Sequence, residues 1–208
     1  MTELLGWHRI LIGVLAGYIL GSLPFAVIFS RLFKNVDIRR VGTGNPGAAN
    51  VFRQVGAVPG ILTWLFDTGK GVAAMILSRE LLGLSGYWIA LVGTAAVAGH
   101  CWSVFLLFRG GKGAAASGAV LLYFVPKLFL IAVAIYFYIQ RVAPRSPALL
   151  FTAIIFFIGL LYIVYPETWV TLLAGIATLI AVGTLANTQA IREMREQRRG
   201  LAGEEESG

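Results

Sequence analysis

Seven stretches of mostly apolar residues alternate with short polar segments along the 208-residue chain. A helix rises 1.5 Å per residue, so about 20 apolar residues cross the roughly 30 Å hydrocarbon core of a membrane. We expect the first stretch to be retained, because Arg31 follows it where a signal-peptide cleavage site would have small residues. The pattern predicts membrane helices over residues 10–30, 59–77, 86–108, 114–125, 128–139, 148–165 and 168–186.

The fourth and fifth stretches are short for full crossings, and Pro126 and Lys127 divide them. Proline removes a backbone hydrogen bond, and lysine at the bilayer centre costs roughly 2.5–3.5 kcal/mol, so a turn at the interface is favoured over one long helix. With seven segments and the N-terminus outside, most arginines and lysines fall on the cytoplasmic side, in agreement with the positive-inside rule. Two alternatives stay open, namely two short crossings or one re-entrant hairpin.

The composition supports a membrane protein, because 58% of the residues are hydrophobic, 13% are charged and the mean hydropathy is +0.80. An ordinary soluble domain has a very different balance. The single cysteine, Cys101, excludes an internal disulfide. We therefore predict an all-α membrane protein, a seven-helix transmembrane bundle with short fourth and fifth helices. Residues 1–187 form its one domain, and residues 188–208 form a basic and then acidic cytoplasmic tail.

Three glycine-rich or basic loops are predicted on one face of the membrane, at residues 37–53, 109–113 and 141–147. Glycine lets backbone N–H groups turn inward as an anion-binding nest, and a helix starting near Ala114 would add the positive end of its dipole. Lys112 and Arg53 contribute cations, and Asn45 and Asn50 are interleaved with the glycines of the first loop. The loops therefore predict sites for phosphate groups.

Two familiar phosphate motifs do not fit these loops. A Walker loop needs glycine and a hydroxyl residue where Leu106 and Gly113 stand, and no strand precedes "GTGNPG" as a dinucleotide fingerprint requires. A plainer alternative is that the glycines only allow close helix contacts and the basic residues only set the topology.

Polar residues also occur within the predicted spans. Asp67 and Lys70 lie one helical turn apart, and charges at this depth usually face a polar interior, so we expect a mutual ion pair. His100 ends the third span, and a hydrogen-bonding role is favoured there over that of a base. Nucleic-acid binding has no support in the sequence.

Four motifs together resemble the bacterial membrane acyltransferases that acylate glycerol 3-phosphate from acyl phosphate. They are "GSLPF" at residues 21–25, "GTGNPGAANVFR" at 42–53, "DTGKG" at 67–71 and "GHCWSVFLLFRGGKGAAA" at 99–116. The resemblance implies transfer of a fatty acyl group to the 1-hydroxyl of glycerol 3-phosphate, giving lysophosphatidate and phosphate. It also implies seven helices, cytoplasmic active-site loops, the bacterial inner membrane as location, and no cofactor, metal or acyl-CoA.

The resemblance assigns roles residue by residue. The candidate catalytic residues are Lys112, Arg53 and Thr43, of which Thr43 replaces the usual serine. No carboxylate and histidine dyad is apparent, so the departing phosphate is favoured as the proton acceptor. The candidate substrate-binding residues are Gly110, Gly111, Gly113, Asn45, Asn50, Ser146 and His100, and Asp67 and Lys70 belong to the polar interior.

The C-terminal segment departs from the family pattern. Similar proteins carry a histidine, an asparagine and a glutamate around a basic segment, whereas here no histidine is available and Glu196 or Ala190 falls on the asparagine. Smaller departures are Ser103 in place of proline and Ala116 in place of threonine. Two rival functions follow, an inactive family member acting as a membrane scaffold and a transporter of small phosphorylated anions.

Overall fold

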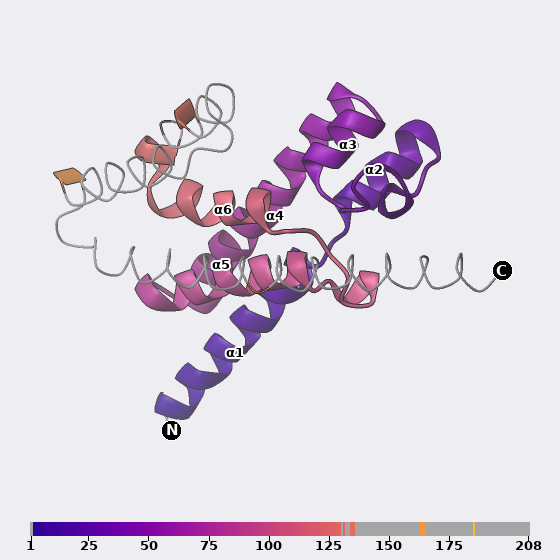
Figure 1. Ribbon diagram of the computed structural model, residues 1–208. Helices are drawn as coiled ribbons and strands as arrows, with labels where there is room; N and C mark the ends of the chain where they lie inside the picture. Colours follow the sequence, from indigo (N-terminus) through magenta and orange to yellow (C-terminus); the bar gives the residue numbers. More distant parts are fainter. Residues whose placement is uncertain (1, 130, 132–133, 136–162, 165–184, 186–208) are drawn as a thin grey trace.

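Helices form all the regular secondary structure in the part of the chain that the structure describes. This computed structural model describes residues 2–129, 131, 134–135, 163–164 and 185 (Figure 1). No strand occurs among these residues. The elements are α1 (Thr2–Gly21), α2 (Phe25–Lys34), η1 (Ile38–Arg40), α3 (Ala48–Gln54), α4 (Ala57–Leu82), α5 (Gly86–Cys101), η2 (Val104–Leu106) and α6 (Ala114–Phe124), where η marks a 3-10 helix.

Three helical stretches are long and apolar enough to cross a membrane, namely Gly6–Lys34, Ala57–Leu82 and Gly86–Leu106. The helix α6 has 11 residues and begins at Ala114, which agrees with the short fourth segment of the sequence pattern. The described residues thus support an all-helical membrane protein. The last three predicted segments lie almost entirely outside the described residues, so the count of seven helices stays a prediction.

Two predicted helices have different bounds in the structure. Residues 10–30 are not one helix, because α1 ends at Gly21 and α2 begins at Phe25. Pro24 causes this break, since it lacks an N–H group and restricts the residue before it. The third predicted span is also too long. The helix α5 ends at Cys101, and Leu107 and Phe108 of the following loop have positive φ angles of 53° and 62°.

Small residues let α1 and α5 lie against each other in parallel. A Cβ atom added to Gly17 would lie 2.7 Å from the Val92 carbonyl oxygen, and one added to Gly21 would overlap the backbone of Ala96. Such glycine contacts allow close approach of membrane helices, where the hydrophobic effect between helices is weak. The helix α4 runs antiparallel to α5, since Met75 lies beside Gly93 and Lys70 lies beside His100. It also runs antiparallel to α1, since Ser78 lies beside Gly13 and Lys70 reaches Leu23, just after the end of α1.

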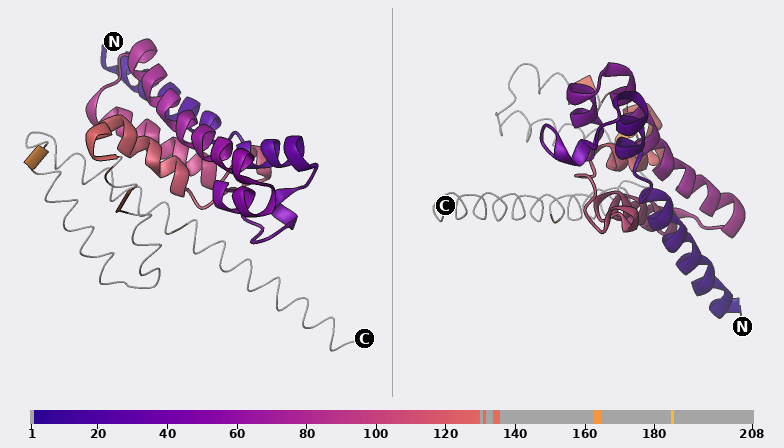
Figure 2. Two further views of the ribbon diagram at one scale, coloured as in Figure 1. Left: turned by 90° about the horizontal axis from the view of Figure 1, so that it is seen from above. Right: turned by 90° about the vertical axis from the view of Figure 1, so that its right-hand side faces the viewer.

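Two apolar clusters fix the positions of the loops. The larger one lies between α4, α5 and α6 and includes Met75, Val97 and Val120. The smaller one holds η2 against α2 and α3 and consists of Ala26, Val27, Ile38, Val51 and Leu106. The smaller cluster therefore brings the chain before residue 109 next to the α2–α3 region. Figures 1 and 2 both show α2 and α3 at the end of the bundle away from the N-terminus.

Candidate active site

Asn50 shapes the first glycine-rich loop from within. Its side chain is 1% exposed, and its amide nitrogen donates to the carbonyl oxygens of Ile38 and Val41 at 3.2 and 3.0 Å. Its amide oxygen accepts from the backbone N–H of Thr43 at 3.1 Å. Gly42 has a φ of +62° and no room for a Cβ atom beside the Asn50 oxygen. The amide of Asn50 therefore faces the loop backbone and holds it in shape.

Asp37 anchors the start of the same loop. Its carboxylate accepts hydrogen bonds from the backbone N–H of Arg39 at 3.1 Å and from the guanidinium of Arg39 at 2.9 and 2.7 Å. These charge-assisted bonds lower the pKa of Asp37 from 3.8 to about 2, with the side-chain bond to Arg39 as the largest cause. Arg39 is thus engaged locally, whereas Arg53 is exposed on α3 and has no ion pair within the described residues.

The second glycine-rich loop uses two of its N–H groups to close α5. Gly110 donates to the carbonyl oxygen of Cys101 and Gly111 to that of His100, each at 3.0 Å. These bonds satisfy carbonyl groups that a helix leaves free at its C-terminus. A nest for an anion would therefore be formed by the N–H groups of Lys112, Gly113 and the first turn of α6. These groups have no acceptor in the part of the chain that the structure describes.

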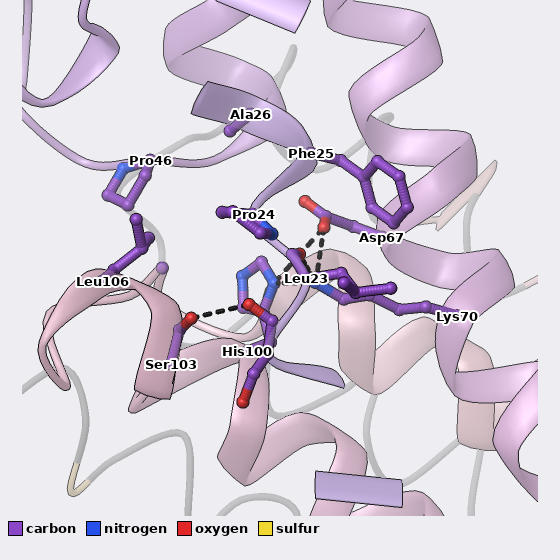
Figure 3. A pocket seen from close by; sticks show the side chains of 12 residues that line it. Leu23, Pro24, Phe25, Ala26, Pro46, Asp67, Lys70, His100, Ser103 and Leu106 are labelled. Carbon is purple, nitrogen blue, oxygen red and sulfur yellow. Dashed lines mark hydrogen bonds and ion pairs between the residues drawn. The ribbon is translucent and has the colours of Figure 1, made fainter. Parts of the chain in front are cut away.

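The two loops meet at Gly111. A Cβ atom on Gly111 would lie 3.1 Å from the carbonyl oxygen of Pro46 in the first loop, and it would overlap Nε2 of His100. Gly111 and Pro46 also line one small pocket (Figure 3). The pocket is lined by Ser22, Leu23, Pro24, Phe25, Ala26, Pro46, Asp67, Lys70, His100, Ser103, Leu106 and Gly111.

A buried polar cluster forms the floor of this pocket. Lys70 Nζ lies 2.7 Å from Asp67 Oδ1, 2.9 Å from the carbonyl oxygen of Leu23 and 3.1 Å from His100 Nδ1. The second carboxylate oxygen of Asp67 is buried and has no partner within the described residues. The cluster therefore links α4, α5 and the break between α1 and α2, as Figure 3 shows.

The remaining predicted site residues do not line this pocket, and one of them lies outside the described residues. Lys112 and Thr43 are exposed, and Asn45 is half-buried in the first loop. Ser146 lies outside the described residues. The sequence reasoning did not assign a site role to the break at residues 22–26, although Pro24 within an apolar stretch was a signal that the chain turns there.

Apolar helices that present two glycine-rich, basic loops at one end define an integral membrane protein suited to hold anionic groups at the interface. The chain belongs to the glycerol-3-phosphate acyltransferase family, whose model matches residues 11–195. The chain is 43% identical over 164 residues to glycerol-3-phosphate acyltransferase 1 of Deinococcus radiodurans, which covers 76% of this chain and 79% of that protein. It is 36% identical over 208 residues to the glycerol-3-phosphate acyltransferase of Jannaschia sp., in an alignment that covers 96% of this chain and 98% of that protein.

Solved structures give the same result at the level of the fold. The chain resembles PlsY (YgiH), an integral membrane glycerol 3-phosphate acyltransferase, with a TM-score of 0.69 and 28% identity over 92% of each chain. That protein has been solved in a glycerol 3-phosphate form and in a lysophosphatidic acid form, and both match this chain equally well.

Proposed function

We propose that this protein transfers a fatty acyl group from acyl phosphate to the 1-hydroxyl of glycerol 3-phosphate, giving lysophosphatidate and inorganic phosphate. The observation that carries this proposal is the meeting of the two motif loops, through Pro46 and Gly111, at one end of an apolar helix bundle. The named activity of the relatives and of the matching solved structures supports the same reaction. The acyl tail would lie in lipid while both phosphates reach the loops.

The loops divide the work between the two phosphates. Lys112 and the N–H groups at the start of α6 hold the phosphate of the donor and stabilise the charge that develops as it leaves. Arg53, with Thr43 and Asn45, holds glycerol 3-phosphate so that its hydroxyl faces the acyl carbon. The hydroxyl oxygen forms a bond to that carbon, the bond from carbon to the phosphate oxygen breaks, and the departing phosphate takes the proton.

The proposed setting is the bacterial inner membrane, with the N-terminus outside and the loops and the C-terminus in the cytoplasm. The full fold would comprise seven helices in one domain over residues 1–187, followed by the tail over 188–208. The third basic loop at residues 141–147, with Ser146, would complete the substrate side. Acyl phosphate is already activated, so the reaction needs no metal or other cofactor.

A direct assay tests the proposal. Purified full-length protein in detergent receives synthetic acyl phosphate and radiolabelled glycerol 3-phosphate, and lysophosphatidate and inorganic phosphate are measured together. We expect equimolar formation of both products. Absence of lysophosphatidate from well-folded protein would exclude the enzyme and favour the scaffold. Exchange of phosphorylated anions across liposomes without product would favour the transporter.

A further inference from the structure

Lys70 has three protons and three acceptors. An ammonium group carries three donors and no acceptor. Its neighbours are Asp67 Oδ1 at 2.7 Å, the Leu23 carbonyl oxygen at 2.9 Å and His100 Nδ1 at 3.1 Å. A carboxylate and a carbonyl oxygen both favour the charged form of the lysine. The contact with His100 therefore uses the third proton of Lys70, and Nδ1 of His100 accepts it.

This contact sets the tautomer of His100. In a neutral imidazole one ring nitrogen carries the proton and the other accepts a hydrogen bond. Asp67 Oδ1 lies 3.5 Å from Nδ1, farther than Lys70, at the limit of a hydrogen bond. Since Nδ1 accepts from Lys70, the proton of the ring lies on Nε2. At Nε2 the ring then acts as a donor and not as a base.

The Nε2 atom points into the site and not into the cluster. In Figure 3 this nitrogen points away from Asp67 and Lys70, toward the side of the pocket that Pro46 and Leu106 line. It lies directly against Gly111, where a Cβ atom would overlap it. No hydrogen bond joins this nitrogen to another of the described residues. The pocket thus holds an N–H donor without a hydrogen bond to a described residue, and this donor lies against Gly111, the residue before Lys112.

We infer that His100 is a substrate-binding residue, whose Nε2–H donates a hydrogen bond to a phosphoryl oxygen in the pocket. Lys70 is a positioning residue, which holds His100 in this tautomer, and Asp67 holds Lys70. The inference rests on the proposed function and deepens it. The phosphoryl oxygen belongs either to acyl phosphate or to glycerol 3-phosphate, and kinetics with each substrate distinguish the two.

The first experiment measures the tautomer without using activity. Full-length protein labelled with ¹⁵N-histidine is studied by NMR near neutral pH, and comparison with the His8→Gln variant separates the two histidines. We expect Nε2 of His100 to be protonated and Nδ1 to be bare, and we expect Lys70→Met to abolish this preference. A proton on Nδ1 in the wild-type protein, or on both nitrogens, would overturn the inference.

The second experiment uses two amides that mimic different ends of the ring. Glutamine places its amide nitrogen near Nε2, whereas asparagine places it near Nδ1. We expect His100→Asn to lower kcat/KM by about 10- to 150-fold, the range for one lost hydrogen bond to a charged group, and His100→Gln to lose at least several-fold less. A higher KM for glycerol 3-phosphate, or for acyl phosphate, identifies the phosphate that is bound.

Equal losses in the two variants at unchanged melting temperature, or full activity in both, would exclude a donor at Nε2. If wild-type protein forms no lysophosphatidate, the proposed function fails. The NMR measurement still decides the tautomer in that case, so the two failures are distinguishable.

Discussion

At the scale of single residues, we expect two cations to carry the phosphate binding that is proposed for the two loops. We predict that Lys112→Ala and Arg53→Ala each lower kcat/KM by roughly 10- to 150-fold, since one charge-assisted contact is worth about 1.5–3 kcal/mol. The measurement is turnover of acyl phosphate in detergent. Arg79→Ala is the matched control, because Arg79 lies at the far end of α4 and pairs with Glu80 on an exposed surface. Normal turnover by both loop variants would remove their assignment.

Asp37 gives the first loop a dependence on pH. Its folded pKa of about 2 lies below the ordinary value of 3.8, so the pair with Arg39 stabilises the fold fully above about pH 4 and loses its effect as the pH falls toward 2. Solvent screens this pair, and we expect about 1 kcal/mol or less. Melting temperatures of wild type and Asp37→Asn should differ at pH 6, and the difference should shrink as the pH falls toward 2. A difference that does not depend on pH would contradict this.

At the scale of the helices, the contact between α1 and α5 depends on the absence of side chains. We predict that Gly21→Val lowers the stability by at least 1–3 kcal/mol, because a Cβ atom there overlaps the backbone of Ala96 and forces the helices apart. Gly6→Ala is the matched control on the same helix, since nothing lies within 4 Å of its added Cβ. Thermal unfolding in detergent measures both, and an equal effect of the two changes would refute the close contact.

The sequence predicts helix starts better than helix interruptions. The start of α6 at Ala114 follows the apolar pattern, and α4 begins at Ala57, close to the predicted residue 59. The break at Pro24 was missed because the apolar pattern continues through it. The end of α5 at Cys101 depends on Gly110 and Gly111, which return along the chain to cap it. Such tertiary contacts leave no periodic signal in the sequence.

In the candidate site, too, the sequence predicts the residue types but not the contacts between distant segments. Residue types and spacing pointed to Lys112, Arg53 and the ion pair of Asp67 with Lys70. They could not show that Gly111 lies next to Pro46. Nor could they show that both the amide nitrogen and the amide oxygen of Asn50 form hydrogen bonds with the loop backbone. These facts depend on which segments far apart in the chain become neighbours.

At the scale of the whole molecule, α5 belongs to a stretch that is long and apolar enough to cross a membrane, so we expect the two ends of this stretch to lie on opposite sides. We predict that a cysteine at Ser85, at the start of α5, reacts with an impermeant maleimide on intact cells. A cysteine at Arg109 should react only after the cells are opened, because the positive-inside rule puts that loop in the cytoplasm. Both changes are made in a Cys101→Ser background, and Cys101 is buried. The opposite labelling pattern would invert the proposed topology.

The interruption between α1 and α2, at residues 22–24, removes regular helical hydrogen bonds and at the same time gives Lys70 an acceptor. In an unbroken helix the Leu23 carbonyl oxygen would accept from the N–H of Val27. Here Val27 donates to Pro24 instead, and the Leu23 oxygen accepts from the N–H of Phe25 and from Lys70 Nζ. A continuous helix, for example in a Pro24→Ala variant, would gain a backbone hydrogen bond at Leu23. The Leu23 carbonyl oxygen would then no longer accept from Lys70. Such a variant would be more stable, but Lys70 would hold His100 less firmly. At this break in the chain, a gain in stability is therefore expected to lower the catalytic rate.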